Sequence, residues 1–315
     1  MQKLFNFNNI VFAVFTPALV GLGIAVLGVR YFTQYGLALF AGLPVLVSFL
    51  AAFLYAYRRQ VGFWRTYGVA MLSILALGGM ILMIAMDGLM CLAMALPLAV
   101  IMALPGAAMG RHFGAAAGNP GGPVIPLLLC AMLPALMGFE HANPPDPLIR
   151  EVITSVEVDA PPDAVWDKLV AFSKIPDPPT GVFALGVAYP IEARIEGHGV
   201  GALRYCTFST GSFIEPITEW NEPRQLSFNV ISNPPPIRET SIYPRINAPH
   251  SHGYMTSKHG QFRLTTLPGG RTLLEGTTWY SHNISPQIYW GPVSDEIIHQ
   301  IHRRVLNHIK EESEH

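Results

Sequence analysis

The charged side chains of this chain are distributed so unevenly that its first 140 residues must fold in a different medium from the rest. The chain has 20 Lys and Arg residues and 21 Asp and Glu residues, but only eight of these 41 lie in residues 1–140. That part has a net charge of +4, and residues 141–315 hold the other 33 charges with a net charge of −5. We therefore expect a membrane part at 1–140, a proline-rich linker at 141–149 and a water-soluble domain at 150–315.

Four apolar stretches in the first part are long enough to cross a bilayer as helices. A bilayer core requires about 20 mostly apolar residues, because inside lipid every backbone polar group must be bonded within its own segment. The four run over about 10–29, 36–57, 67–86 and 88–109, and a fifth at 123–139 is shorter and contains three prolines. The sequence therefore predicts an all-α transmembrane bundle of four or five helices.

The basic residues of the first part predict its orientation. Lys3, Arg58, Arg59, Arg65 and Arg111 fall on one side if the spans alternate, and only Arg30 falls on the other. The positive-inside rule then places the N-terminus in the cytoplasm, in a plasma or inner membrane. Five spans would put the C-terminal domain outside the cytoplasm, whereas four would keep it inside.

Few residues of the first part suggest transport. Asp87 lies at a predicted turn and the arginines lie at predicted span ends, whereas a transporter carries ionisable residues within its spans. The first apolar stretch also lacks the small-residue exit of a cleaved signal peptide, so we expect it to remain as an anchor. A membrane anchor is favoured, and a transporter regulated by the C-terminal domain stays open as an alternative.

Composition also excludes several classes of partner. No cluster of basic residues indicates nucleic acid binding. Cys91, Cys130 and Cys206 are too few and too scattered for a disulfide framework or a zinc site. We therefore expect no cofactor and no metal, and the sequence names no protein partner.

The second part has the order of an α+β domain. We expect strands at 153–158, 193–196, 203–209, 212–219, 225–231, 261–267 and 272–280, a short helix after a turn at 159–162, and a long helix over 293–312. Val165, Leu169 and Phe172 form the apolar stripe of the short helix. The glycines of "GHGVG" from Gly197 and "PGG" from Pro268 predict hairpins, so adjacent strands should pair antiparallel. This order predicts a helix packed on one face of a curved sheet.

The same part resembles the START-like or SRPBCC superfamily, also called helix-grip or polyketide cyclase-like. The resemblance rests on "VDAPPDAVWDKL", the meander "EGHGVGALRYCTFSTGSFIEPITEWNEPRQLSFNV", the hairpin "GQFRLTTLPGGRTLLEGTTWY" and the helix "DEIIHQIHRRVLNHIK". It implies a curved antiparallel sheet around a long C-terminal helix, with a cavity that usually receives a hydrophobic ligand. A membrane tether fits a lipid-like ligand, since it holds the cavity near the bilayer.

The long helix supplies the first candidate site residues. Its apolar arc consists of Ile297, Ile298, Ile301, Val305 and Ile309. His302 and His308 fall within this arc, whereas Glu296 and His299 point away from it. A buried histidine must find a hydrogen-bond partner in the core or on a ligand, and both readings stay open, with the core partner favoured.

The strands and one long loop supply the other candidates. The expected ligand-binding residues are His302, His308, Tyr205, Phe228, Phe262, Tyr280 and Arg204. "PPPIRETSIYPRINAPHSHGYMTSKHG" from Pro234 is a long irregular connection, and such loops are usually functional or disordered. Tyr243, Arg245, His250 and His252 form the expected lid over the cavity. His250 and His252 lack a carboxylate or cysteine at ligand spacing, so no metal site is predicted.

Two functions from different classes remain. The first is a membrane-anchored binder of a hydrophobic or lipid-like molecule, and the second is a cyclase- or hydrolase-type enzyme using His302, Arg204 or Tyr205. "STGS" from Ser209 lacks the Gly-x-Ser-x-Gly elbow of a serine hydrolase, and no acid–base constellation is recognisable. The binder is therefore favoured over the enzyme. An apolar cavity would support it, and cavity groups with displaced pKa values would support the enzyme.

Overall fold

The structure is a computed structural model that describes residues 2–32, 35–117, 124–144, 146–238, 243, 253 and 255–315. The chain divides into two compact units. The first comprises Met1–Pro145 with the short segments Glu239–Pro249 and Ile284–Tyr289. The second comprises Asp146–Arg238, His250–Asn283 and Trp290–His315.

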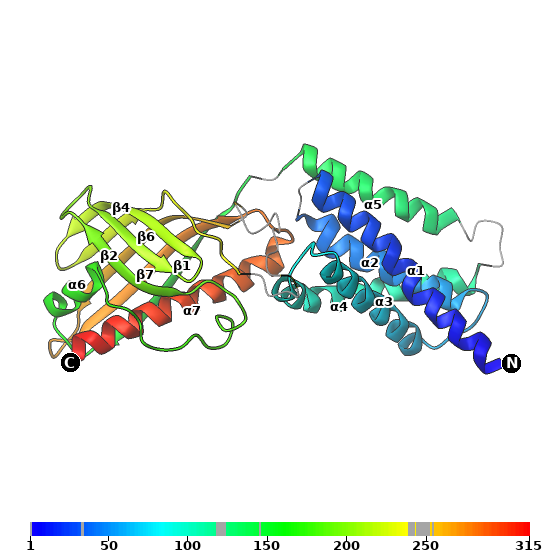
Figure 1. Cartoon of the computed structure of the whole chain (residues 1–315), viewed down its shortest axis with the longest axis horizontal. Coiled ribbons are helices and arrows are strands. Elements are labelled where there is room, and N and C mark those ends of the chain that lie inside the picture. Colours follow the sequence, from blue (N-terminus) through cyan, green and yellow to red (C-terminus); the bar gives the residue numbers. More distant parts are fainter. Residues whose placement is uncertain are drawn as a thin grey trace. The chain divides into compact units, whose positions relative to one another are not determined.

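The first unit consists of apolar helices (Figure 1). They are α1 (Gln2–Tyr31), α2 (Leu43–Ala56), α3 (Phe63–Met83), α4 (Leu89–Ala115) and α5 (Val124–Ala142), and a π-helical turn, η1 (Ala38–Gly42), leads into α2. Five described helical stretches are long and apolar enough to span a membrane: Asn9–Tyr31, Ala38–Ala56, Phe63–Met83, Leu89–Ala115 and Val124–Ala142. This is consistent with a membrane protein.

Close packing between α2 and α4 depends on glycine. A Cβ atom on Gly110 would lie 2.2 Å from the carbonyl oxygen of Phe49, and one on Gly106 would lie 2.4 Å from that of Val45. Small residues of this kind let two membrane helices approach backbone to backbone. Glu140, at the end of α5, accepts a hydrogen bond of 3.1 Å from the Ala38 amide at the start of η1.

The second unit is a seven-stranded antiparallel sheet with two helices. The strands are β1 (Ile149–Val158), β2 (Pro190–Glu196), β3 (Leu203–Phe208), β4 (Gly211–Asn221), β5 (Gln225–Asn229), β6 (Met255–Thr266) and β7 (Thr272–His282). Their order in the sheet is β1-β7-β6-β5-β4-β3-β2. The sheet curls as a half-barrel around the long helix α7 (Gln287–Glu314), and α6 (Pro162–Val170) lies at one end (Figure 1). This is the helix-grip arrangement that the sequence predicts.

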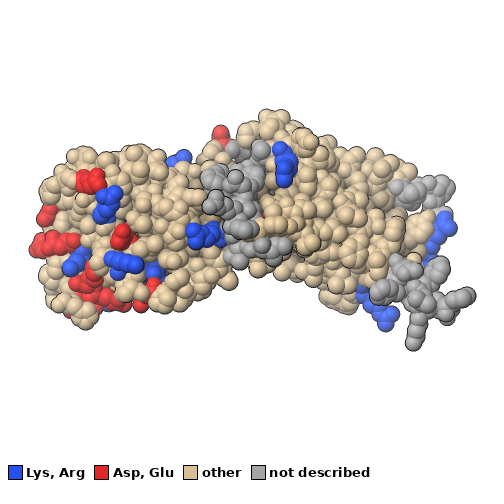
Figure 2. Space-filling view, viewed as in Figure 1, with Lys and Arg blue, Asp and Glu red and all other residues tan. Residues whose placement is uncertain are grey.

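Local sequence accounts for most of these elements. Gly197, Gly199 and Gly201 have positive φ in the β2–β3 turn, and Gly269 and Gly270 have positive φ between β6 and β7, so both glycine hairpins are confirmed. In α6, Pro162 is the first residue of the helix, and Val165, Trp166 and Leu169 are buried. Figure 2 shows the charged side chains gathered over this unit, with few on the face shown of the helical unit.

Several predicted boundaries differ from the structure, and in the α+β part the starts of α7 and β6 were wrong by six residues each. The helix α7 begins six residues before the predicted start at 293, because Pro292 is accommodated inside it although proline usually ends a helical pattern. The strand β6 begins at Met255 and not at 261, since its first residues pair with Ser281 and His282 of β7. Local propensity does not predict a helix that continues through Pro292. It also does not predict a strand that begins at the polar residues before 261.

Candidate functional site

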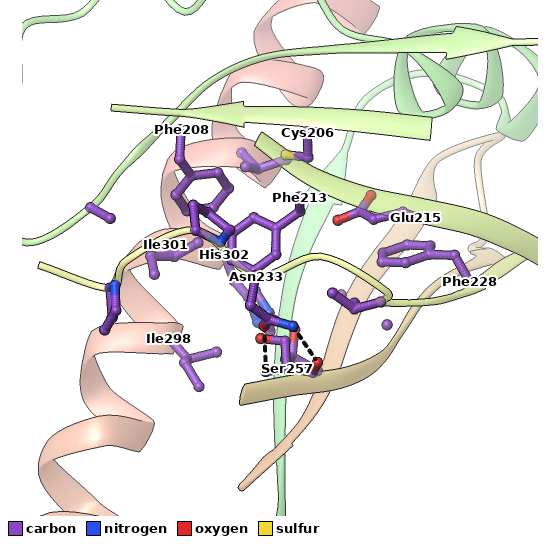
Figure 3. A pocket seen from close by; sticks show the side chains of 18 of the residues that line it. Cys206, Phe208, Phe213, Glu215, Phe228, Asn233, Ser257, Ile298, Ile301 and His302 are labelled. Atoms are coloured by element: carbon purple, nitrogen blue, oxygen red, sulfur yellow. Dashed lines mark hydrogen bonds between the residues drawn. The ribbon is translucent and has the colours of Figure 1, made fainter. Parts of the chain in front are cut away.

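A cavity of about 140 Å³ lies between the inner face of the sheet and α7. Figure 3 shows Phe208, Phe213 and Phe228 from the strands, and Ile298 and Ile301 from the helix, around this space. The rings of Phe208 and Phe213 meet edge to face, with centroids 4.8 Å apart. The cavity therefore has predominantly apolar and aromatic walls, as sites for hydrophobic ligands do.

A glycine in β6 allows the wall to form. A Cβ atom on Gly260 would lie 2.4 Å from the ring of Phe228, which is closer than real side-chain contacts. Phe228 can therefore lie close to the β6 backbone, with its ring centroid 6.1 Å from that of Phe262. The missing side chain of Gly260 thus leaves room for the ring of Phe228 on the cavity wall.

A buried ion pair crosses two neighbouring strands at the wall. Arg204 of β3 and Glu215 of β4 are direct partners in the sheet register, and the Arg204 Nη1 donates to Glu215 Oε2. Their exposed fractions are 1% and 6%. The guanidinium also lies 5.4 Å from the ring centroid of Phe228 and 5.5 Å from that of Phe262. Burial raises the pKa of Glu215, and the adjacent guanidinium opposes this shift.

Cys206, next on the inner face of β3, does not resemble a catalytic thiol. Burial, followed by the charge of Glu215, raises its pKa to about 12, although Arg204 lowers it. The thiol is therefore protonated at neutral pH, whereas cysteine nucleophiles need the thiolate. Within the described ranges, no group of three metal-ligating side chains is close enough to hold an ion.

His302 lies on α7 at the cavity with both ring nitrogens engaged. Nδ1 is 3.0 Å from Thr154 Oγ1 of β1, and Nε2 is 2.8 Å from Thr278 Oγ1 of β7. Burial and the charge of His299 lower the pKa of His302 to about 4, so the ring is neutral near pH 7. A neutral ring with two partners is a satisfied core histidine, and that reading describes its contacts best.

His299 corrects the helical-wheel expectation. It was expected to point away from the domain, but its Nδ1 lies 2.7 Å from the same Thr154 hydroxyl. The helix α7 lies in the curved sheet, so β1 reaches farther around it than a single apolar arc implies. Glu296, as expected, is exposed and pairs with Arg303.

One edge of the cavity is formed by the segment Asn233–Pro236. Asn233 Oδ1 accepts from the Ser257 amide at 2.8 Å, and its Nδ2 donates to the Ser257 carbonyl, as Figure 3 shows. The carbonyl of Pro236 accepts from the Ala188 amide at 2.9 Å. The segment is therefore fixed to β6 on one side and to the chain before β2 on the other.

The structure brings four of the predicted ligand-binding residues together. His302, Arg204, Phe228 and Phe262 all line the cavity. Tyr205 lies on the other face of β3, where Arg194 stacks on its ring at 4.3 Å. Tyr280 is buried beside α7 and donates to Asp295 at 2.7 Å. His308 does not itself line the cavity; it contacts Ser173 and the ring of Phe172, which does.

The predicted lid falls largely outside the described residues. Arg245, His250 and His252 all lie there. Tyr243 is described, and its hydroxyl donates to the carbonyl of Met83 at 2.5 Å within the first unit. The lid therefore remains an untested prediction.

Sequence reasoning missed the polar partners Glu215, Thr154 and Thr278, and it also missed the cavity-lining rings of Phe208 and Phe213. Glu215 had a usable signal, because it stands opposite Arg204 across the short β3–β4 turn, and an opposite-charge pair at such positions indicates a shared face. The two threonines had none, since threonine is frequent in strands regardless of function.

Solved structures resemble the C-terminal part of this chain. No protein-family model matches the chain, and no curated protein matches it. Among solved structures, the Zhui aromatase/cyclase from Streptomyces sp. R1128 is 15% identical, covers 53% of this chain and 94% of its own, and has a TM-score of 0.33. Norcoclaurine synthase from Thalictrum flavum is 13% identical, and the match covers 54% of this chain and 96% of the synthase, with a TM-score of 0.34. Protein XoxI from Bacillus cereus is 15% identical, and the match covers 51% of this chain and 93% of XoxI, with a TM-score of 0.33.

Proposed function

We propose that this chain is a membrane-anchored protein that binds a hydrophobic or lipid-like small molecule in the cavity between the sheet and α7. The observation that carries the proposal is the wall itself, where Phe208, Phe213 and Ile301 border a space of about 140 Å³. Burying apolar ligand surface against such a wall contributes about 25 cal/mol per Å². The membrane anchor keeps the cavity near the phase in which such a ligand dissolves.

The polar groups of the cavity support binding without catalysis. Arg204 is paired with Glu215, and His302 is bonded to two threonines. Catalysis of acyl or proton transfer needs a nucleophile or base free to meet the substrate. His259, the other histidine of the wall, contacts Asn229 Oδ1 through Nδ1 at 3.2 Å.

An enzyme of the cyclase or hydrolase type is the second candidate. It is favoured by one observation, the buried carboxyl of Glu215 with its raised pKa on a cavity wall. A binder releases its ligand chemically unchanged. Recovery of a converted product after incubation with extracted membrane lipids, abolished by Glu215→Gln, would favour the enzyme.

The topology is part of the proposal. If all five apolar helices cross the bilayer, the basic residues place the N-terminus in the cytoplasm and the C-terminal domain outside it. Protease digestion of spheroplasts should then cleave a C-terminal tag without lysis. Protection of the tag until lysis would contradict this orientation.

Filling the cavity tests the binding proposal. Ile301→Trp enlarges a side chain that borders the cavity, so we expect at least tenfold weaker binding of α-methylstyrene to the full chain in nanodiscs. Equilibrium dialysis against empty nanodiscs removes the contribution of lipid. Ile153→Trp is the matched control, because Ile153 is 51% exposed on β1. Equal binding by wild type and Ile301→Trp would contradict the proposal.

A further inference from the structure

Four side chains form a continuous series of hydrogen-bond contacts across the domain. His299 Nδ1 lies 2.7 Å from Thr154 Oγ1, which lies 3.0 Å from His302 Nδ1. His302 Nε2 in turn lies 2.8 Å from Thr278 Oγ1. The four residues come from α7, β1 and β7, and only His302 and Thr278 line the cavity.

Proton counting links the two ends of this series. Thr154 has one hydroxyl hydrogen and faces two ring nitrogens, so it donates to one histidine and accepts from the other. His302 is neutral, and one of its nitrogens therefore donates while the other accepts. The direction of every bond is thus fixed once the direction at His299 is fixed.

Protonated and neutral His299 have different consequences at the cavity. With both ring nitrogens protonated, His299 must donate to Thr154, which then donates to His302 Nδ1. His302 Nε2 donates to Thr278, so the hydroxyl hydrogen of Thr278 is free to donate to a ligand in the cavity. A neutral His299 also permits the reverse series, in which Thr278 donates to His302 and offers only lone pairs. The described residues supply no other hydrogen-bond partner for the Thr278 side chain.

The surroundings of His299 hold charges of both signs. Asp295 lies one turn earlier on α7 and accepts hydrogen bonds from Arg150 of β1 and Tyr280 of β7. Glu296 and Arg303 pair on the exposed side of α7. Histidine is the side chain whose proton is gained and lost at physiological pH.

We propose that the series His299–Thr154–His302–Thr278 sets the polarity of the cavity wall, so that protonated His299 makes Thr278 a hydrogen-bond donor to the ligand. The inference rests on the proposed function and narrows it to apolar molecules that carry a neutral oxygen acceptor such as a carbonyl. Arg204 and Glu215 are already paired with each other at the wall, and a ligand carboxylate would add an uncompensated charge there. His302 and His299 act as positioning residues, and Thr278 makes the contact.

Two nearly isosteric probes separate this inference from binding itself. Acetophenone carries a carbonyl oxygen where α-methylstyrene carries a CH₂ group, and neither probe titrates. Binding to the full chain in nanodiscs is measured by equilibrium dialysis between about pH 5 and 8. We expect acetophenone to bind about tenfold more tightly at the acid end, the effect of one hydrogen bond, and α-methylstyrene to bind equally throughout.

Variants locate the source of the pH response. Thr278→Val should remove it, and Thr278→Ser, which keeps the hydroxyl, should restore it even if the valine variant is poorly folded. His299→Asn cannot gain a proton and should flatten the acetophenone profile. His198→Asn, an exposed histidine in the β2–β3 turn, is the matched control and should keep the profile.

Several results would overturn the inference. A flat acetophenone profile in the wild type, or a profile that survives His299→Asn, would do so. So would a profile lost in His259→Asn but kept in His299→Asn, because His259 is another histidine at the cavity. Failure of both probes to bind would remove the proposed function, and this inference with it.

Discussion

The two units of this chain differ in the polar side chains that they bury. In the described part of the helical unit, the buried polar side chains are three hydroxyls, Ser48, Thr66 and Ser73, and each donates to a backbone carbonyl. The sheet unit buries hydroxyls too, such as that of Thr272, but it also buries the ionisable pair Arg204 and Glu215, which meet at a cavity. Hydroxyls bonded to backbone carbonyls are satisfied within the protein, whereas ionisable side chains at a cavity are typical of a site. The difference supports the proposal that the sheet unit recognises a ligand and that the helices serve as an anchor.

The largest effect should come from breaking the ion pair on one side only. Arg204→Met leaves Glu215 as an uncompensated buried carboxylate, a change that costs about 3–5 kcal/mol and lowers the apparent Tm by roughly 10 °C. The melting transition of the sheet unit can be followed by tryptophan fluorescence of the full chain. Arg204→Met with Glu215→Leu should recover most of the loss, since no charge is then buried alone.

The exposed pair Arg271 and Glu157 is the control for this comparison. Its side chains are 44% and 58% exposed, and removing Arg271 should cost about 1 kcal/mol or less. Equal losses of stability from Arg204→Met and Arg271→Met would mean that breaking the buried pair costs no more than breaking an exposed one.

The next effect concerns the packing of the helical unit. Gly110→Ala puts a Cβ atom 2.2 Å from the Phe49 carbonyl oxygen, so we expect it to destabilise the bundle by about 1–3 kcal/mol. Gly79→Ala is the matched change, because nothing lies within 4 Å of its Cβ position. Thermal denaturation in detergent should separate the two variants, and probe binding by the sheet unit should survive in both. If Gly110→Ala lost probe binding while the sheet unit stayed folded, binding would depend on the helical unit as well, which would contradict the comparison.

The smallest effect is an acid dependence of the sheet unit. Burial acts to raise the pKa of Asp295, but hydrogen bonds from Arg150 and Tyr280 outweigh it and hold this pKa below its usual range. The folded pKa is depressed, so the stabilisation is present above about pH 4 and is lost as pH falls through the folded value. Asp295→Asn should therefore lower stability by about 1 kcal/mol near pH 7, with the deficit shrinking in acid. A deficit that is constant from about pH 3 to pH 7 would contradict this assignment.

The predictability of the fold and of the site from sequence differed for a physical reason. Strand alternation, helical periodicity and the hairpin glycines are local features of the sequence, so the sheet, α6 and the long helix α7 could all be predicted. The inner face of a strand depends on the curl of the whole sheet, and alternation alone could not choose between Arg204 and Tyr205 on β3. The partners of His302 come from β1 and β7, more than 20 residues away along the chain, and no local pattern indicates them.

The most direct test of the central claim is native mass spectrometry of the full chain released from its own membrane in mild detergent. The account predicts one apolar species bound at up to one molecule per chain in the wild type and in Ile153→Trp. It predicts that this species is absent from Ile301→Trp, whose added ring occupies the cavity. An empty wild-type protein, or the same bound species on Ile301→Trp, would contradict the account.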